Sequence, residues 1–152
     1  MPAAGQGTPP LQKRLSLAVG AQLREFVRER ANRRCEYCGI AEASVPYLIF
    51  HFDHIVARQH LDAVTDDRAS LAWACSHCNY HKGPNLASID PLTLSQVDLF
   101  HPRRDRWQEQ FAIENGRVTG TTPQGRATAR LLNMNAPRII RLRRELTDQG
   151  QY

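Results

Sequence analysis

Residues 75–83 read Cys75-Ser76-His77-Cys78-Asn79-Tyr80-His81-Lys82-Gly83, and this stretch decides how the chain folds. A second cysteine pair with the same spacing, Cys35 and Cys38, lies upstream, and 36 residues separate the two pairs. Each pair places two thiolates on one tight turn, and two such turns can share a tetrahedral ion. Zinc suits four sulfur ligands best. We therefore predict a structural zinc site, and its four ligands are Cys35, Cys38, Cys75 and Cys78.

Two other roles for the cysteines are weaker. Disulfides are typical of secreted proteins, and the first residues, Met1 to Pro10, lack the apolar core of a secretory signal. A redox motif needs one Cys-x-x-Cys pair, whereas this chain has two. Because a four-thiolate zinc site has no open coordination position, we expect it to contribute folding energy rather than catalysis.

The length of 152 residues suits one domain with modest extensions. The apolar content of 41% is ordinary, so wholesale disorder is not expected. No apolar run is long enough to cross a bilayer, and we expect a cytoplasmic protein with no membrane partner. We divide the chain into a flexible N-terminal tail (1–20), a zinc-stabilised core (21–100) and a basic C-terminal extension that packs on the core (101–152).

The net charge of +5 is distributed unevenly. Residues 1–34 carry seven basic and two acidic side chains, residues 35–100 carry three and eight, and residues 101–152 carry ten and five. An acidic centre between two basic flanks favours a polyanion as partner. Of the 20 basic residues 18 are Arg, whose planar fork matches phosphate oxygens. The alternative is the arginine-coated surface of a protein from a high-GC genome, which composition alone supports at least as well.

Hydrophobic patterning predicts the elements around the two cysteine pairs. A helix precedes Cys35, because Leu23, Phe26 and Val27 fall at helical spacing. Two strands rich in aromatic and branched residues follow, with a polar loop between them, and a short helix carries the last cysteine and stops at Gly83-Pro84. The expected bounds are 21–34 for the first helix, 47–52 and 71–74 for the strands, 57–69 for the loop and 76–82 for the short helix.

Beyond Pro84 the sequence signals for helices and strands are weaker, and the strongest of them is a hairpin. Asn115-Gly116 between alternating residues predicts a hairpin over residues 111–119. Thr122-Pro123 predicts the start of a helix that runs to about Asn133, with threonine as the N-cap. Residues 137–146 predict a last helix.

An acid and a histidine, Asp53 and His54, close the first predicted strand, and Asn79 follows the last cysteine. Phosphodiester hydrolysis needs a base that takes a proton from water and a cation that stabilises charge on the phosphate and on the departing oxygen. The oxygens of Asp53 and Asn79 are hard ligands for a magnesium-like ion, and a histidine suits the base. Because adjacent strand residues point to opposite faces, we expect a bend at the strand end to bring Asp53 and His54 together.

Each of these three residues also has an ordinary interpretation. An Asp-His pair is common on protein surfaces, and Asn79 is suited to cap the helix after Cys78. Taken alone, each ordinary interpretation is favoured over catalysis. The presence of all three residues on one zinc scaffold favours catalysis instead.

Three segments together resemble the HNH nuclease motif, and its zinc-stabilised members in particular. They are Asp53-His54-Ile55, Ser70-Leu71-Ala72-Trp73-Ala74-Cys75 and Cys78-Asn79-Tyr80-His81-Lys82-Gly83. The core match runs from Cys35 to Gly83, and a looser resemblance to a group of bacterial HNH proteins extends to about Leu146. The looser match rests on Phe100-His101-Pro102-Arg103-Arg104-Asp105-Arg106-Trp107 and Gly125-Arg126-Ala127-Thr128. The resemblance implies an α+β fold, a ββα-metal hairpin with a four-cysteine zinc knuckle and flanking helices.

By this resemblance, Asp53 and Asn79 ligate a catalytic Mg²⁺ or Mn²⁺ ion, and His54 activates the attacking water. Lys82 matches a basic position that lies near the phosphate. The chain departs from the family at Ser70, where the family usually has an asparagine that steadies the loop carrying the base. Serine is shorter, so this departure bears on the efficiency of catalysis more than on the fold.

Further histidines and arginines are candidates for supporting roles. His51 shares a strand face with Asp53, so it is suited to add a metal ligand or to touch phosphate, with a packed or surface histidine as an equal alternative. His77 is expected to be exposed, and a phosphate contact is the less favoured role for His81. Trp107 is expected in the core rather than stacked on a base. The candidates for binding nucleic acid are Arg103, Arg104 and Arg106, followed by Arg138, Arg141, Arg143 and Arg144 on the last helix, each with a solvated face as the alternative.

Taken together, these features predict a metal-dependent endonuclease that hydrolyses DNA phosphodiester bonds, with His54 as general base and a single divalent ion. RNA is the alternative substrate. The main rival is a zinc-stabilised DNA-binding module without catalysis, for which Ser70 is the best support. A second rival is an interaction domain in which zinc serves folding alone.

Overall fold

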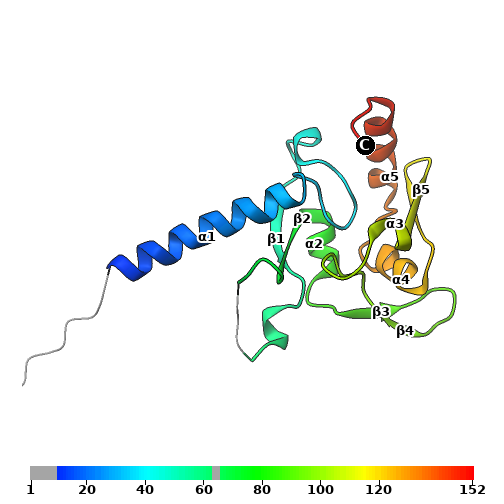
Figure 1. Ribbon diagram of the computed structural model, residues 1–152. Helices are drawn as coiled ribbons and strands as arrows, with labels where there is room; N and C mark the ends of the chain where they lie inside the picture. The colour runs from blue at the N-terminus through cyan, green and yellow to red at the C-terminus, as the bar shows by residue number, and fades with distance from the viewer. Residues whose placement is uncertain (1–9, 63–65) are drawn as a thin grey trace, which may run out of the picture.

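A computed structural model describes residues 10–62 and 66–152 of the chain. The first helix, α1 (Pro10–Arg30), is longer than predicted, and its N-terminal part projects away from the rest of the protein (Figure 1). Proline is favoured in the first turn of a helix, which fits a start at Pro10. The helix ends at Arg30 because Asn32 and Arg33 adopt positive φ angles of 51° and 53°. The helix therefore begins before the predicted residue 21 and ends before Arg34, and residues 1–9 of the predicted tail lie outside the described residues.

A ββα unit forms the centre of the protein. Strand β1 (Phe50–His54) pairs antiparallel with β2 (Leu71–Cys75), so that Phe50 lies opposite Cys75 and His54 opposite Leu71. Helix α2 (Ser76–Lys82) follows β2 directly and ends at Gly83, whose φ of +51° breaks the helix. The predicted ββα hairpin is confirmed.

The first strand begins later than predicted. Tyr47 and Ile49 are 76% and 67% exposed and precede β1, although their side chains favour strands. The strand instead continues through Asp53 and His54, and the chain bends only after His54. The expected bend at the strand end is present, but it follows both residues and so does not turn the side chains of Asp53 and His54 toward one another.

Helix α1 covers one face of the β1–β2 hairpin. Val27, Leu71 and Trp73 form a buried cluster, against which Phe50 and Phe52 pack. Arg30 donates a hydrogen bond to Leu71 O at 2.7 Å and so ties the end of α1 to the start of β2. Helix α2 contacts both strands. In this way the two helices enclose the hairpin.

The C-terminal half adds two short β-ribbons and three helices. The hairpin predicted around Asn115 and Gly116 is confirmed, and both turn residues have positive φ angles. Thr122 caps the next helix as predicted, accepting a hydrogen bond from Gly125 N at 3.0 Å. The ribbon β3–β4 and the short α3 were not predicted. The bounds are β3 (Ala87–Ile89), β4 (Gln96–Asp98), α3 (Trp107–Gln110), β5 (Phe111–Glu114), β6 (Arg117–Gly120), α4 (Pro123–Leu131) and α5 (Pro137–Asp148), with 3₁₀ turns at Glu42–Ser44 and Arg58–His60.

The main hydrophobic core joins the cysteine region to the C-terminal half. Its buried members include the four cysteines together with Phe100, Phe111, Leu132 and Leu146. Trp107 packs against this core, as expected, and its Nε1 donates to Tyr37 O at 2.8 Å. No helix within residues 10–62 and 66–152 is long and apolar enough to cross a membrane.

Candidate metal centre and active site

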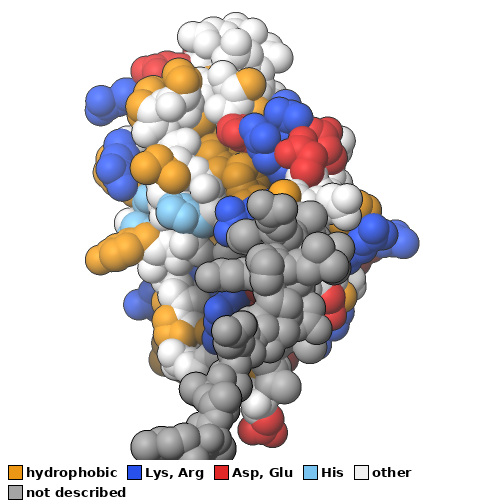
Figure 2. Space-filling model, turned by 90° about the vertical axis from the view of Figure 1, so that its left-hand side faces the viewer, with side chains coloured by type: hydrophobic (Ala, Val, Ile, Leu, Met, Phe, Trp, Pro, Cys, Tyr) orange, Lys and Arg blue, Asp and Glu red, His pale blue; other side chains and the backbone are white. Residues whose placement is uncertain are grey.

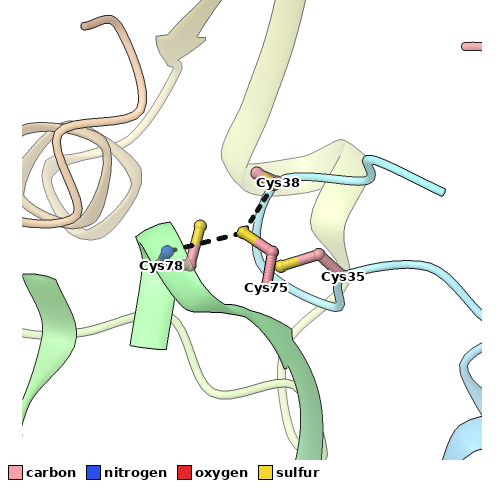
Figure 3. A group of neighbouring side chains, drawn as sticks. All are labelled: Cys35, Cys38, Cys75 and Cys78. Carbon is pink, nitrogen blue, oxygen red and sulfur yellow. Dashed lines mark hydrogen bonds between the residues drawn. The ribbon is translucent and has the colours of Figure 1, made fainter. Parts of the chain in front are cut away.

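The four cysteines gather at one point, as predicted (Figure 3). Their sulfur atoms lie within 4.8 Å of one another, all four residues are buried, and none forms a disulfide. Cys38 Sγ and Cys75 Sγ are 3.8 Å apart. Sulfurs that bind zinc at 2.3 Å in a tetrahedron are separated by about 3.8 Å. The cluster therefore fits a zinc ion.

Crowding of the thiols shifts pKa values within the cluster. Hydrogen bonds from Cys35 and the other thiols hold the pKa of Cys75 far below its usual value. The same contacts, together with burial, raise the pKa values of Cys38 and Cys78 well above theirs. One buried thiolate thus suppresses the ionisation of its neighbours. A divalent cation at the centre would remove this repulsion and allow four thiolates, which is the state that zinc requires.

Asp53 lies on the face of β1 that is turned away from α1, and it is 5% exposed. Tyr37 donates a hydrogen bond from its hydroxyl to Asp53 Oδ2 at 2.5 Å. Lys82 Nζ lies 3.2 Å from Oδ1 and 3.1 Å from Oδ2. Burial raises the pKa of Asp53, while Lys82 and Tyr37 oppose this rise by stabilising the charged form. The carboxylate is therefore held by donors from two different segments.

Lys82 is itself buried, with 2% of its surface exposed. Besides Asp53, its ammonium group donates to His54 O at 3.2 Å. The resemblance implied a basic group near the phosphate, whereas the structure places Lys82 in a buried ion pair beneath the strand. Its role in the described structure is to neutralise Asp53 and to join α2 to the end of β1.

His54 contacts a different set of side chains from Asp53. Its Nε2 atom lies 2.8 Å from Asp66 Oδ1, and Arg58 Nε lies 3.3 Å from the same ring nitrogen. Arg58 also pairs with Asp66, with a shortest distance of 3.0 Å. The hydrogen bond from His54 is the main reason that the pKa of Asp66 is lowered. The His54 side chain is 25% exposed, so it remains accessible to water.

Asn79 occupies the middle of α2, which packs on β1. Within the described residues its side chain forms no hydrogen bond, and it is partly exposed. The alternative role as a helix cap is excluded, because the N-cap is Cys75, whose Sγ accepts a hydrogen bond from Cys78 N at 3.4 Å. The amide of Asn79 is thus available as an oxygen ligand.

Ser70 stabilises the loop that carries Asp66. Asp67 N donates to Ser70 Oγ at 3.0 Å, and Ser70 N donates to Asp67 Oδ1 at 2.8 Å. Ile55 N donates to Ser70 O at 3.0 Å, directly after His54. The serine hydroxyl therefore contacts the Asp67 backbone within the loop, and the backbone of Ser70 joins the loop to Ile55.

Within the described residues, none of the remaining histidines forms a hydrogen bond with the side chain of Asp53 or His54. His51 is exposed, whereas Asp53 on the same strand face is buried. His77 was expected to be exposed but is 6% exposed, because it packs under the C-terminal half and its Nε2 lies 2.8 Å from Asn133 O. The half-buried His81 stacks near His77 with ring centroids 4.3 Å apart, and its Nδ1 lies 2.8 Å from His77 O.

Several of the arginines proposed for nucleic acid have structural partners. Arg103 forms a largely buried ion pair with Glu36, and burial lowers its pKa to about 10. Arg143 is fully buried and donates to Gly116 O and Met134 O, which corrects its assignment to a solvated or phosphate-binding face. Arg144 donates to Asn115 O at 2.6 Å. Arg104 and Arg106 remain exposed, and so do Arg138 and Arg141.

Two exposed arginines near β1 were not singled out from the sequence. The Arg24 guanidinium lies 5.4 Å from the centre of the Phe52 ring, and that of Arg68 lies 4.1 Å from the centre of the Phe26 ring. Neither forms an ion pair with any carboxylate of the described residues, unlike Arg28, which pairs with Glu42 at 2.7 Å. On the face from which α1 projects, histidine side chains lie beside Lys and Arg side chains (Figure 2).

Tyr37 and Asp66 are the two site residues that sequence reasoning missed. Tyr37 is set within the first cysteine pair, and an aromatic residue with a hydroxyl inside a predicted metal-binding turn was a signal of a polar contact, although it did not identify Asp53 as the partner. Asp66 stood among three acids of a polar loop, and nothing in the sequence distinguished it from Asp62 or Asp67.

Comparison with known proteins supports the interpretation of this region. Residues 35–85 match the family model described as HNH endonuclease. The match includes both cysteine pairs, β1, β2 and α2. No curated protein and no solved structure gives a significant match to the chain.

Proposed function

We propose that this chain, whose residues 35–85 form an HNH domain, is a metal-dependent endonuclease that hydrolyses DNA phosphodiester bonds. The observation that carries the proposal is the placement of three side chains on two packed elements. Asp53 and His54 end β1, and Asn79 lies on α2, which contacts β1. The zinc cluster supports the role of a scaffold, because its ligands stand at the end of β2 and in the first turn of α2.

The carboxylate of Asp53 and the amide oxygen of Asn79 are hard ligands suited to Mg²⁺ or Mn²⁺. Such an ion, when bound, stabilises negative charge on the phosphate and on the departing 3′ oxygen. Lys82 and Tyr37 favour the charged form of the buried Asp53, which a cation ligand needs to be, and so oppose the rise in its pKa that burial causes. Each carboxylate oxygen has more than one acceptor site, so these donors leave room for a further ligand.

His54 supplies the base in this proposal. The carboxylate of Asp66, 2.8 Å from Nε2, favours the tautomer with hydrogen on Nε2, and this tautomer leaves the lone pair of Nδ1 to accept a proton from the attacking water. Asp66 also stabilises the positive charge that the ring gains in this step. Arg58 binds Asp66 from the other side and restrains that carboxylate.

A second function, a zinc-stabilised DNA-binding module without catalysis, has one specific observation in its favour. Both oxygens of Asp53 already have donors, from Tyr37 and from Lys82, so the carboxylate is satisfied without an ion. This alternative predicts retention of DNA in a gel with no cut product in Mg²⁺ or Mn²⁺.

The decisive experiment is cleavage of supercoiled plasmid by the zinc-loaded protein in Mg²⁺ or Mn²⁺. His54→Ala is expected to lower the rate by about 10²- to 10⁴-fold, the usual contribution of a general base. His60→Ala is the matched control, because His60 is an exposed histidine of the following loop whose ring contacts Pro84 O. Equal cleavage by the His54→Ala and control proteins would remove His54 from the mechanism, and binding without cleavage by the unmodified chain would favour the second function.

A further inference from the structure

We infer that Tyr37 is a positioning residue that couples the zinc site to the metal-binding carboxylate of Asp53. The inference rests on the proposed function, since it assigns Asp53 the role of a ligand for the divalent ion. Tyr37 itself touches neither substrate nor ion. It acts by fixing the orientation of the Asp53 carboxylate from within the zinc-binding turn.

The geometry places Tyr37 between two zinc ligands. It stands in the turn from Cys35 to Cys38, and its side chain is 1% exposed. Its hydroxyl donates to Asp53 Oδ2 at 2.5 Å, across a sequence separation of 16 residues. Tetrahedral coordination of zinc by the four cysteines would fix the conformation of this turn. The turn then determines the position of the Tyr37 hydroxyl.

The backbone around Tyr37 is restrained on both sides. Trp107 Nε1 donates to Tyr37 O at 2.8 Å, and Glu36 N donates to Trp73 O at 2.8 Å. Gly39 N closes the turn by donating to Cys35 O at 2.8 Å. A hydroxyl on so rigid a support can hold a carboxylate in one orientation, whereas one on a mobile loop cannot.

Two donors from separate elements hold the Asp53 carboxylate. Tyr37 reaches Oδ2 from the zinc turn, and Lys82 reaches both oxygens from α2. Lys82 alone allows the carboxylate to rotate about its own axis, because an ammonium group is a point charge with no preferred plane. The Tyr37 hydroxyl removes that freedom and leaves a defined edge of the carboxylate for an ion. Removing a residue that hydrogen-bonds to a metal ligand typically lowers the affinity for the metal by about 10- to 100-fold.

The test is Tyr37→Phe, which deletes the hydroxyl and keeps the ring. Mn²⁺ binding to the zinc-loaded protein is measured from the electron paramagnetic resonance signal of free Mn²⁺, and Asp53→Asn gives the background that does not depend on Asp53. We expect Asp53-dependent Mn²⁺ affinity to fall by about tenfold in Tyr37→Phe. The concentration of Mn²⁺ that half-saturates plasmid cleavage should rise by the same factor, with a smaller change in the rate at saturation.

Tyr152→Phe is the matched control. The hydroxyl of Tyr152 donates to Cys38 O, so this variant also removes a tyrosine hydroxyl that contacts the zinc-binding turn, but it leaves Asp53 untouched. We expect it to bind Mn²⁺ like the unmodified protein. Zinc content and the unfolding midpoint, measured for both variants, identify any loss that comes from the zinc turn rather than from Asp53.

A double variant protects the test against a general loss of stability. If Tyr37 acts through Asp53, then adding Tyr37→Phe to Asp53→Asn lowers Mn²⁺ affinity no further. Unchanged Asp53-dependent affinity in Tyr37→Phe, or equal loss in Tyr152→Phe, would overturn the inference and leave the nuclease proposal standing. Absence of Asp53-dependent Mn²⁺ binding together with absence of cleavage in the unmodified chain would overturn both.

Discussion

At the scale of single residues, Asp53 and His54 show how neighbours in sequence acquire different chemistry. Alternation along β1 buries Asp53 against Tyr37 and Lys82 and leaves His54 beside Asp66. The first side chain is thereby held rigidly in a dry setting that suits a metal ligand. The second is accessible to water and paired with an acid, as a base requires.

Asn79→Ala separates a role in the reaction from a role in the fold. Because the Asn79 side chain forms no hydrogen bond within the described residues and alanine favours helices, the free energy of unfolding should stay within about 0.5 kcal/mol of the unmodified protein. Cleavage should fall by about 10- to 100-fold, the cost typical of weakening a metal site. Urea unfolding measures the change in stability, and initial rates of plasmid nicking measure the change in activity. Full activity in Asn79→Ala would remove this amide from the ligand set.

The candidate ligands and the base could be proposed from the sequence, whereas their supports could not. The motif residues have fixed spacings that a reader of the sequence can match. The contacts of Tyr37 with Asp53 and of His54 with Asp66 span 16 and 12 residues and join different elements. No periodicity relates such residues, because turn and loop geometry alone bring them together. The same reason explains why His77 was expected at the surface and lies in the interior.

At the scale of elements, the strands and helices with strong patterns were predicted and the weak ones were not. The turn at Asn115-Gly116 and the cap at Thr122 depend on local chemistry, and both are present. The strands of the β3–β4 ribbon have three residues each, too few for an alternating pattern to register. The start of β1 was misjudged because Tyr47 and Ile49 favour strands but lie exposed before it.

Helix α1 and the loop before β2 carry the surface that we expect to bind DNA phosphates. Arg24 lies over Phe52, two residues before His54 on the same strand face, and Arg68 lies over Phe26 of α1. Stacking on a ring holds each guanidinium in place while its N–H edges stay exposed. Most neighbouring arginines are already engaged, Arg28 by Glu42 for example. Oriented cations that pair with no carboxylate among the described residues are suited to hold the substrate backbone near the candidate base.

The double variant Arg24→Gln/Arg68→Gln tests this surface. A plot of log binding constant against log salt concentration has a negative slope, and each lost phosphate contact should make that slope shallower by about 1. The loss of two arginine contacts should therefore make it shallower by about 2. Binding is measured with the cleavage-deficient His54→Ala protein, by fluorescence anisotropy of a labelled duplex at several salt concentrations. Arg117→Gln/Arg130→Gln is the matched control, since these arginines are exposed on β6 and α4 and neither is a candidate for binding nucleic acid. Equal slopes for the two double variants would place the DNA elsewhere.

At the scale of the whole molecule, the zinc site and the C-terminal half depend on one core. The cysteines share a buried cluster with Phe100, Phe111 and Leu146, and Tyr152 donates to Cys38 O from the far end of the chain. Arg126 binds both oxygens of the buried Asp90 at 2.8 Å and fixes the β3–β4 ribbon to α4. These contacts join segments that the sequence alone presented as a core and an extension.

Removal of zinc should therefore unfold the cysteine region and the C-terminal half together, in one step. Binding of structural zinc contributes about 10–16 kcal/mol in zinc-finger peptides, which equals or exceeds the whole stability of a typical domain. Two variants that each keep a single tryptophan allow fluorescence to follow the two regions separately. Trp73 lies under α1, and Trp107 packs against the C-terminal core. On addition of a strong chelator, we expect zinc release, loss of far-ultraviolet circular dichroism and the fluorescence changes of both tryptophans to follow one time course. Zinc release that leaves the Trp107 signal native would show that the C-terminal half folds without the metal, and the shared core would then contribute less than its burial implies.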